Sequence, residues 1–327
     1  MKKINVVPFR KFWQDCFNCI VYSLIDYTFH VPDLYYYNNM YTYKITEETA
    51  RDGDKEILYI SATPWTDNFR LIEEITREEE LQFWETEKDV IGYIKKALDE
   101  DKVVLAAVDL FYWIDEGLHY HHNHISHMSL VIGYDDDIQK MYILETGNGG
   151  FTEFCVTYDC AIEAIQHTDF PTRVLELNKD AAVKMYDKAD LAFYAKDVIK
   201  SIDEIVEKKD QLWAVEEVSE EGLYEVLSIL QTHIFSMQNR AEIDAYLFEN
   251  AFESDVIDNI SLSEEFLKNA NAFEKLKGVC IKLQHRKNRL EGIHKLKDNV
   301  FELLKKNRNL WSLYIEKNDL LCMRDIK

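Results

Sequence analysis

The most informative stretch of the chain reads His124-Ile-Ser-His127-Met-Ser-Leu-Val-Ile-Gly-Tyr-Asp135. Residues 128–134 form an apolar run and a polar segment follows, which is the pattern of a buried strand that ends at a hairpin turn. His127 stands at the start of this strand, where a side chain is held more firmly than in a loop. More than a hundred residues earlier, Asp15-Cys16-Phe-Asn-Cys19 opens a helical pattern. A cysteine and a histidine placed in this way are the two groups that nucleophilic acyl chemistry needs.

Cys16 is the predicted nucleophile and His127 the predicted base. A thiol reacts slowly near neutral pH until an imidazole removes its proton, and a third group must fix the tautomer of that imidazole. Backbone N–H groups at a helix start favour a thiolate and can stabilise an oxyanion. Cys19 lies one turn deeper, where we expect it to be packed and inert. The third group is either Glu145, on the next predicted strand, or Asp109, which otherwise has a structural role in tying down the loop after its strand.

Composition bounds the class of protein. The 327 residues, 47% of them hydrophobic, suffice for one large domain or two ordinary ones. The net charge of -22 argues against binding to nucleic acid or to anionic membranes, because phosphate binding needs clustered Lys and Arg. No run of about 18 apolar residues exists and residues 1–8 lack the apolar core of a signal peptide, so we expect a soluble, cytoplasmic protein. Six cysteines in a chain of this length do not make a disulfide framework.

Two groups of metal-binding residue types occur in the chain. Cys16 and Cys19 form a CxxC pair, but Cys155 and Cys160 do not supply a second pair with zinc-site spacing. Residues 119–127 contain five of the ten histidines, without an HExxH helix or carboxylates at metalloenzyme spacing. We therefore predict neither a metal ion nor a bound cofactor.

The composition changes near residue 178, since all four prolines and seven of the ten glycines precede it. A long proline-free region is typical of long helices, so we predict an all-helical domain over 179–327, which is also a candidate homodimer interface. Residues 1–178 mix helix and strand patterns, so we predict an α+β domain there. In the first domain we expect helices at 16–29, 89–98 and 160–167, and strands at 56–62, 103–112, 128–134, 141–145, 154–158 and 173–177. In the second we expect helices at 181–208, 222–237 and, in two or three pieces, 264–315, with an N-cap within Ser261-Leu-Ser263.

These segments resemble the butirosin biosynthesis protein H family, within the C39-like, papain-fold cysteine peptidases. The resemblance covers Trp13 to about Leu177. Asp15-Cys16 looks like the family's nucleophile segment, and residues 102–112 look like its strand that ends in an aspartate and aromatic residues. Residues 124–135 look like its His-x-x-His and V-x-G-Y-D strand.

The acidic member of the triad falls, by this resemblance, on Glu145 of Tyr142-Ile-Leu-Glu145. The chain departs from the family pattern at two positions. Thr146 follows the acid where C39-like peptidases carry a proline after an aspartate. Arg10 stands where a glutamine of the oxyanion hole is expected, with Gln14 nearby.

The resemblance implies a papain-like (C39-like) cysteine protease fold and an amide-forming acyltransferase of secondary-metabolite biosynthesis. The acyl donor would be a thioester on the phosphopantetheine arm of an acyl or peptidyl carrier protein. The acceptor would be a diamine, polyamine or aminoglycoside, which the negative charge of the chain attracts. Because an acidic carrier would be repelled, we expect a local basic patch of Lys282, Arg286, Lys287 and Arg289. The alternatives are a C39-like peptidase or thioesterase and a non-catalytic papain-fold binding module.

Overall fold

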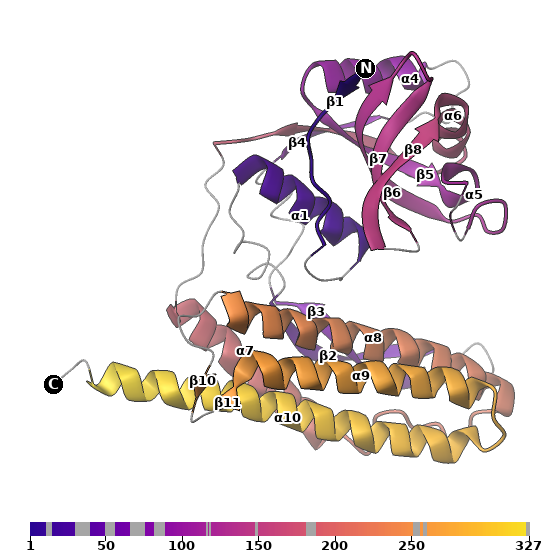
Figure 1. The fold of residues 1–327 in the computed structure, drawn as a ribbon. Helices are drawn as coiled ribbons and strands as arrows, with labels where there is room; N and C mark the ends of the chain where they lie inside the picture. The colour runs from indigo at the N-terminus through magenta and orange to yellow at the C-terminus, as the bar shows by residue number, and fades with distance from the viewer. Residues whose placement is uncertain are drawn as a thin grey trace. The chain divides into compact units, whose positions relative to one another are not determined.

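The computed structural model describes residues 1–10, 15–29, 40–49, 56–65, 76–81, 89–115, 117, 119–147, 150–180, 188–250, 256–257 and 260–324. The chain divides into two compact units, one made of residues 1–35 and 69–184 and the other of residues 36–68 and 185–327. Helices and strands occur in both, so the protein belongs to the α+β class, as predicted (Figure 1). Among the helices built from the described residues, none combines the length and apolar character that crossing a bilayer requires.

The first unit is built around a seven-stranded sheet. Its path runs β4 (Thr76–Leu81), β9 (Thr172–Leu177), β5 (Val103–Asp109), β6 (Ser126–Asp135), β7 (Lys140–Gly147) and β8 (Gly150–Thr157), and β1 (Lys2–Lys3) pairs with the end of β6. The neighbouring strands are antiparallel. Every residue of β5 is buried, which requires cover on both faces at the centre of the sheet.

Within the described residues, four helices pack around this sheet: α1 (Cys16–Phe29), α4 (Val90–Asp99), α5 (Leu110–Trp113) and α6 (Tyr158–Gln166). Helix α1 contacts β6 and β7, whereas α4 and α6 contact β5 and each other. The predicted strand over 103–112 ends earlier, at Asp109. The Asp109 carboxylate accepts a hydrogen bond from the Phe111 N–H at 3.0 Å, and this N-cap starts α5.

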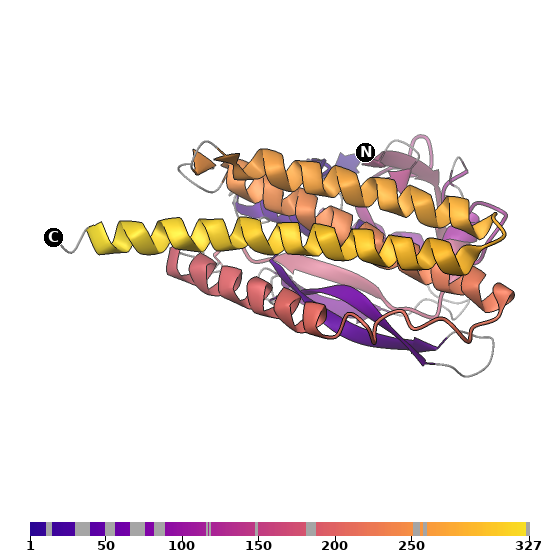
Figure 2. The ribbon, with the colours of Figure 1, turned by 90° about the horizontal axis from the view of Figure 1, so that it is seen from below.

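The second unit combines four helices with a β-hairpin, among the residues that the structure describes. The helices are α7 (Lys188–Glu207), α8 (Glu220–Asn250), α9 (Leu262–Gln284) and α10 (Arg289–Arg324), and Figure 2 shows them with the hairpin of β2 (Tyr41–Thr49) and β3 (Glu56–Pro64) alongside. A short pair, β10 (Val256–Ile257) and β11 (Ile260–Ser261), precedes α9. Ser261 is the N-cap of α9, as predicted, and its Oγ accepts from the Glu264 N–H at 3.2 Å. Helix α8 continues to Asn250, well beyond the predicted end at residue 237.

The predicted domain boundaries need a correction, because residues 36–68 belong to the second unit. Strand β2 packs against α7 and strand β3 against α8. The side chains of Tyr41, Tyr43 and Ile60 lie on one face of the hairpin and are buried, and this apolar face needs the helices to cover it. The second unit is therefore not all-helical, although the predicted boundary at residue 178 lies near the observed division between 184 and 185.

A buried polar network joins the hairpin to the helices of the second unit. The Tyr41 hydroxyl donates to Asp244 Oδ2 at 2.7 Å. The amide of Asn307 donates to the hydroxyls of Tyr41 and Tyr43 at 3.3 and 3.1 Å. Burial raises the pKa of Asp244 to about 8, against the opposing effects of the Tyr41 hydrogen bond and the positive charge of Arg240. The folded protein thus holds this carboxyl protonated over a pH range in which the unfolded chain ionises it.

This difference predicts that the contribution of Asp244 to stability falls as the pH rises from about 4 to about 8, because the folded state binds the extra proton. Asp244→Asn removes the titrating group, so its urea midpoint should fall less than that of the wild type between pH 5 and pH 8. Asp210→Asn, at an exposed carboxylate, is the control and should keep the wild-type pH dependence. Parallel pH profiles for the wild type and Asp244→Asn would contradict the prediction.

Candidate active site

Cys16 is the first residue of α1, and the Asp15 side chain before it accepts a hydrogen bond from the first turn of that helix, as an N-cap does. The Asn18 N–H donates to Asp15 Oδ1 at 2.7 Å, and the Cys19 N–H donates to the Asp15 carbonyl at 3.1 Å. The first N–H groups of a helix have no carbonyl four residues earlier, so the Cys16 thiol lies at the positive end of the helix dipole. Cys19 is only 1% exposed and packs in the core, as expected.

The register of the sheet brings His127 and Glu145 together. Strands β6 and β7 align Leu130 with Leu144, and continuing this register places Glu145 opposite Ser129. Directly opposed residues share a face of the sheet, as do residues two positions apart on one strand. Glu145 therefore lies diagonally across from His127, within reach of a long side chain. The two side chains meet, with His127 Nε2 3.2 Å from Glu145 Oε1.

The same sheet separates Asp109 from His127. Strands β5 and β6 pair Asp109 with Ser126 and Val108 with His127. Successive side chains of a strand point to opposite faces, so Asp109 and His127 face away from each other. Of the two carboxylates that the sequence left open, the structure brings Glu145, and not Asp109, to the imidazole.

Asp109 instead fastens the loop that follows β5. Its Oδ2 lies 2.7 Å from His124 Nδ1, and its Oδ1 accepts from the N–H groups of Phe111 and Ile125 at 3.0 and 3.2 Å. These contacts join the two ends of the segment between β5 and β6. These contacts are those expected if Asp109 ties down the loop after its strand, which was the alternative to a catalytic role.

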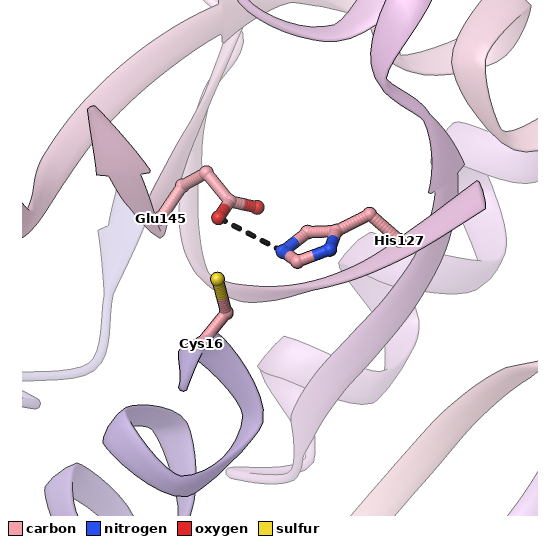
Figure 3. A group of neighbouring side chains, drawn as sticks. All are labelled: Cys16, His127 and Glu145. Atoms are coloured by element: carbon pink, nitrogen blue, oxygen red, sulfur yellow. Dashed lines mark hydrogen bonds and ion pairs between the residues drawn. The ribbon is translucent and has the colours of Figure 1, made fainter. Parts of the chain in front are cut away.

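Cys16 completes a compact cluster with His127 and Glu145. The Cys16 sulfur, a ring nitrogen of His127 and a carboxylate oxygen of Glu145 all lie within 4.8 Å of one another. Figure 3 shows the thiol and the carboxylate on the same side of the imidazole ring. Thr146 supports the cluster twice, since its N–H donates to Glu145 Oε1 at 2.7 Å and its hydroxyl donates to Cys16 Sγ at 3.3 Å. Sequence reasoning missed Thr146, whose only signal was its position directly after Glu145.

The electrostatics of the cluster favour a charged imidazole. Burial lowers the pKa of His127, but hydrogen bonds to Cys16 and Glu145 and the negative charges of these groups outweigh it and raise the pKa to about 10. The Glu145 side chain is 4% exposed. Its second oxygen, Oε2, is buried and has no hydrogen-bond partner among the described residues.

A pocket of about 330 Å³ opens onto this cluster. That volume is at the lower end of the range for small-molecule sites, so the pocket suits a small group. The pocket lining combines the three clustered residues with several apolar side chains. Besides the cluster, its lining within the described part of the chain consists of Leu110, Ile114, Gly117, His119, Ile125, Thr146 and Gly147.

In the histidine-rich segment, residues 119–127, two of the imidazole rings stack on neighbouring aromatic side chains. His121 stacks on Tyr120 with ring centroids 4.1 Å apart, and His124 stacks on Phe111 at 4.2 Å. Among the described residues, the side chains of Cys16, His127 and Glu145 are those that converge as metal ligands do.

Arg10, which stands where the resemblance expects a glutamine, binds β8. Its Nε donates to the Phe151 carbonyl at 3.2 Å, and its Nη2 donates to the Thr152 hydroxyl. Gln14 lies outside the described residues. The backbone N–H of Cys16, at the helix start, is therefore the described group best placed to stabilise an oxyanion on an attacked carbonyl.

Comparison with known proteins assigns no family. No protein-family model matches the chain, and no curated protein sequence matches it. The functional argument therefore depends on the residues and their geometry.

The raised pKa of His127 predicts that this residue accelerates the alkylation of Cys16. Because the imidazole ring keeps its positive charge to about pH 10, it should favour attack by the Cys16 sulfur on iodoacetamide from pH 6 to 9. His127→Ala should therefore react more slowly at Cys16 over this range and at an unchanged rate at Cys155. Peptide mass spectrometry can follow Cys16 and the exposed Cys155 in the same samples. The prediction is wrong if Cys16 reacts as fast in the variant as in the wild type.

Proposed function

We propose that this protein is a cysteine-dependent, amide-forming acyltransferase whose first unit has a papain-like (C39-like) fold. The observation that carries the proposal is the meeting of Cys16, His127 and Glu145 in the lining of a pocket. They follow one another along the chain as nucleophile, base and acid. The nucleophile begins a helix that packs on the sheet, and the other two lie on adjacent strands, which is the arrangement that the resemblance implies.

The chemistry follows from the protonation states. The Cys16 thiolate attacks the carbonyl carbon of an acyl thioester, and the N–H groups at the start of α1 stabilise the oxyanion. Collapse of this intermediate expels the donor thiolate, which takes the proton of the His127 imidazolium. The neutral imidazole then accepts a proton from an amine as the amine attacks the acyl-enzyme. Departure of the Cys16 thiolate yields the amide, while Glu145 keeps the imidazole oriented.

The donor and acceptor follow from the resemblance and from charge. A carrier protein would present the donor on its phosphopantetheine arm, and a diamine, polyamine or aminoglycoside would be the acceptor. The net charge of -22 supports a cationic acceptor. Arg289 is engaged by Glu220 at 2.8 Å, which leaves Lys282, Arg286 and Lys287, all exposed, as the basic patch for an acidic carrier.

The setting of the protein is part of the same proposal. We place the enzyme in the cytoplasm, where the free cysteines Cys16, Cys19, Cys155, Cys160 and Cys280 would stay reduced. A homodimer through the helices of the second unit also remains a prediction.

The acyl-enzyme provides the direct test. Incubation with a small acyl thioester and no amine should add one acyl mass to the protein, as seen by intact-protein mass spectrometry. Cys16→Ala should show no adduct, whereas Cys19→Ala should retain it, because Cys19 is buried one turn deeper in α1. His127→Ala should form the adduct far more slowly.

The outcomes separate the alternatives. Addition of an amine should release the acyl group as an amide faster than water releases it as an acid. Release by water alone would favour a peptidase or thioesterase. An adduct on neither cysteine would favour a non-catalytic binding module, and an adduct that vanishes only in Cys19→Ala would overturn the assignment.

The two buried carboxylates should respond differently to amide substitution. Glu145→Gln should lower kcat by up to about 10⁴-fold, because the amide no longer stabilises the imidazolium. Asp109→Asn should change kcat little, since an amide oxygen can still accept from Phe111 and Ile125, and should mainly lower Tm. If Asp109→Asn proves the more damaging to kcat in a folded protein, Glu145 is not the orienting carboxylate.

A further inference from the structure

The cluster of Cys16, His127 and Glu145 is more compact than proton relay requires. In a linear triad the imidazole stands between nucleophile and acid, with one partner at each ring nitrogen. Here the thiol and the carboxylate lie on the same side of the ring, and all three donor atoms are within 4.8 Å of one another (Figure 3). A sulfur, a nitrogen and an oxygen from three separate elements thus converge on one point.

We infer that these three side chains form a binding site for a single Zn²⁺ ion. Thiolate, imidazole and carboxylate are the ligands that zinc takes in proteins. In a tetrahedral site the nitrogen and oxygen ligands are about 3.4 Å apart, and the sulfur and nitrogen ligands about 3.6 Å. His127 Nε2 and Glu145 Oε1 are already 3.2 Å apart. The Cys16 sulfur, within 4.8 Å of both, has to move by at most about 1.2 Å to reach the tetrahedral spacing.

Two further features of Glu145 fit a metal site. The Thr146 N–H holds Glu145 Oε1 at 2.7 Å, as the supporting hydrogen bonds of metal-binding carboxylates do. The other oxygen, Oε2, is buried in a residue that is 3% exposed and has no partner among the described residues. A cation in the cluster would offset the hydration that this buried oxygen has lost. The three ligands line the pocket of about 330 Å³, which leaves the fourth position open to it.

Bound zinc and acyl transfer exclude each other at this site. The sulfur lone pair that attacks a carbonyl is the same one that would bind the metal, so Zn²⁺ acts as a reversible inhibitor. This consequence rests on the proposed function, whereas the binding of the metal does not.

Cobalt provides a spectroscopic probe of the site. Metal-free protein titrated with Co²⁺ should develop a thiolate-to-cobalt absorption in the near ultraviolet that saturates at one equivalent and disappears on addition of Zn²⁺. Cys16→Ser should lose the absorption, and Cys155→Ser, at an exposed thiol, should keep it. Glu145→Gln should weaken Zn²⁺ binding at least about tenfold, since even outer partners of metal ligands contribute 10- to 100-fold.

A second measurement needs no variant. One equivalent of Zn²⁺ should protect Cys16, but not Cys155, from iodoacetamide, and a chelator should restore the reaction.

The two experiments define how the inference fails. It fails if Cys16 is not protected, or if the thiolate absorption persists in Cys16→Ser. It also fails if binding occurs without thiolate absorption and is lost in a His121→Ala, His122→Ala double variant, because the metal would then lie on the histidine-rich loop. Acyl-enzyme formation without zinc binding would overturn this inference and leave the proposed function intact. Zinc binding without any acyl-enzyme would support this inference and overturn the proposed function.

Discussion

The register of β5, β6 and β7 is the constraint on which the candidate site depends. It places His127 and Glu145 on one face of the sheet and Asp109 on the other. A slip of one residue between β6 and β7 would turn Glu145 away from the imidazole and break the packing of the apolar residues that are buried on both faces of β6. Because the core fixes the register, the free energy of burying the central strands also fixes the relation between base and acid.

The buried carboxylates of Asp109 and Glu145 show how similar groups acquire different roles. Asp109 accepts hydrogen bonds from two backbone N–H groups and contacts His124, so its oxygens are satisfied within the loop that it fastens. Glu145 concentrates its contacts with Thr146 and His127 on one oxygen and leaves the other without a described partner. An unsatisfied buried acceptor costs about 1–3 kcal/mol, a cost typical of functional groups rather than of structural ones.

Periodicity in the sequence predicted most of the elements, because α1, α4, β6, β7, α9 and α10 each carry a strong apolar pattern between clear capping or turn residues. It missed β2 and β4, and β4 reads Thr-Arg-Glu-Glu-Glu-Leu, without the alternation that marks a strand. It also assigned the hairpin to the wrong unit, since only tertiary packing shows that its buried tyrosines face α7 and α8. Cys16, His127 and Glu145 could be named from residue type and order, but the choice between Glu145 and Asp109 required the strand register.

The compactness of the cluster connects reactivity with metal affinity. A carboxylate close to both the thiol and the imidazole stabilises the imidazolium, and the imidazolium in turn supports the thiolate. The same closeness gathers three anionic or lone-pair donors around one point, which suits a divalent cation. A longer, linear relay would weaken the attraction for metal, but it would also remove the carboxylate from the sulfur side of the ring. The two functions therefore need different distances. Zinc binding needs Glu145 to be close to both Cys16 and His127, whereas orientation of the imidazole needs only the contact between Glu145 and His127.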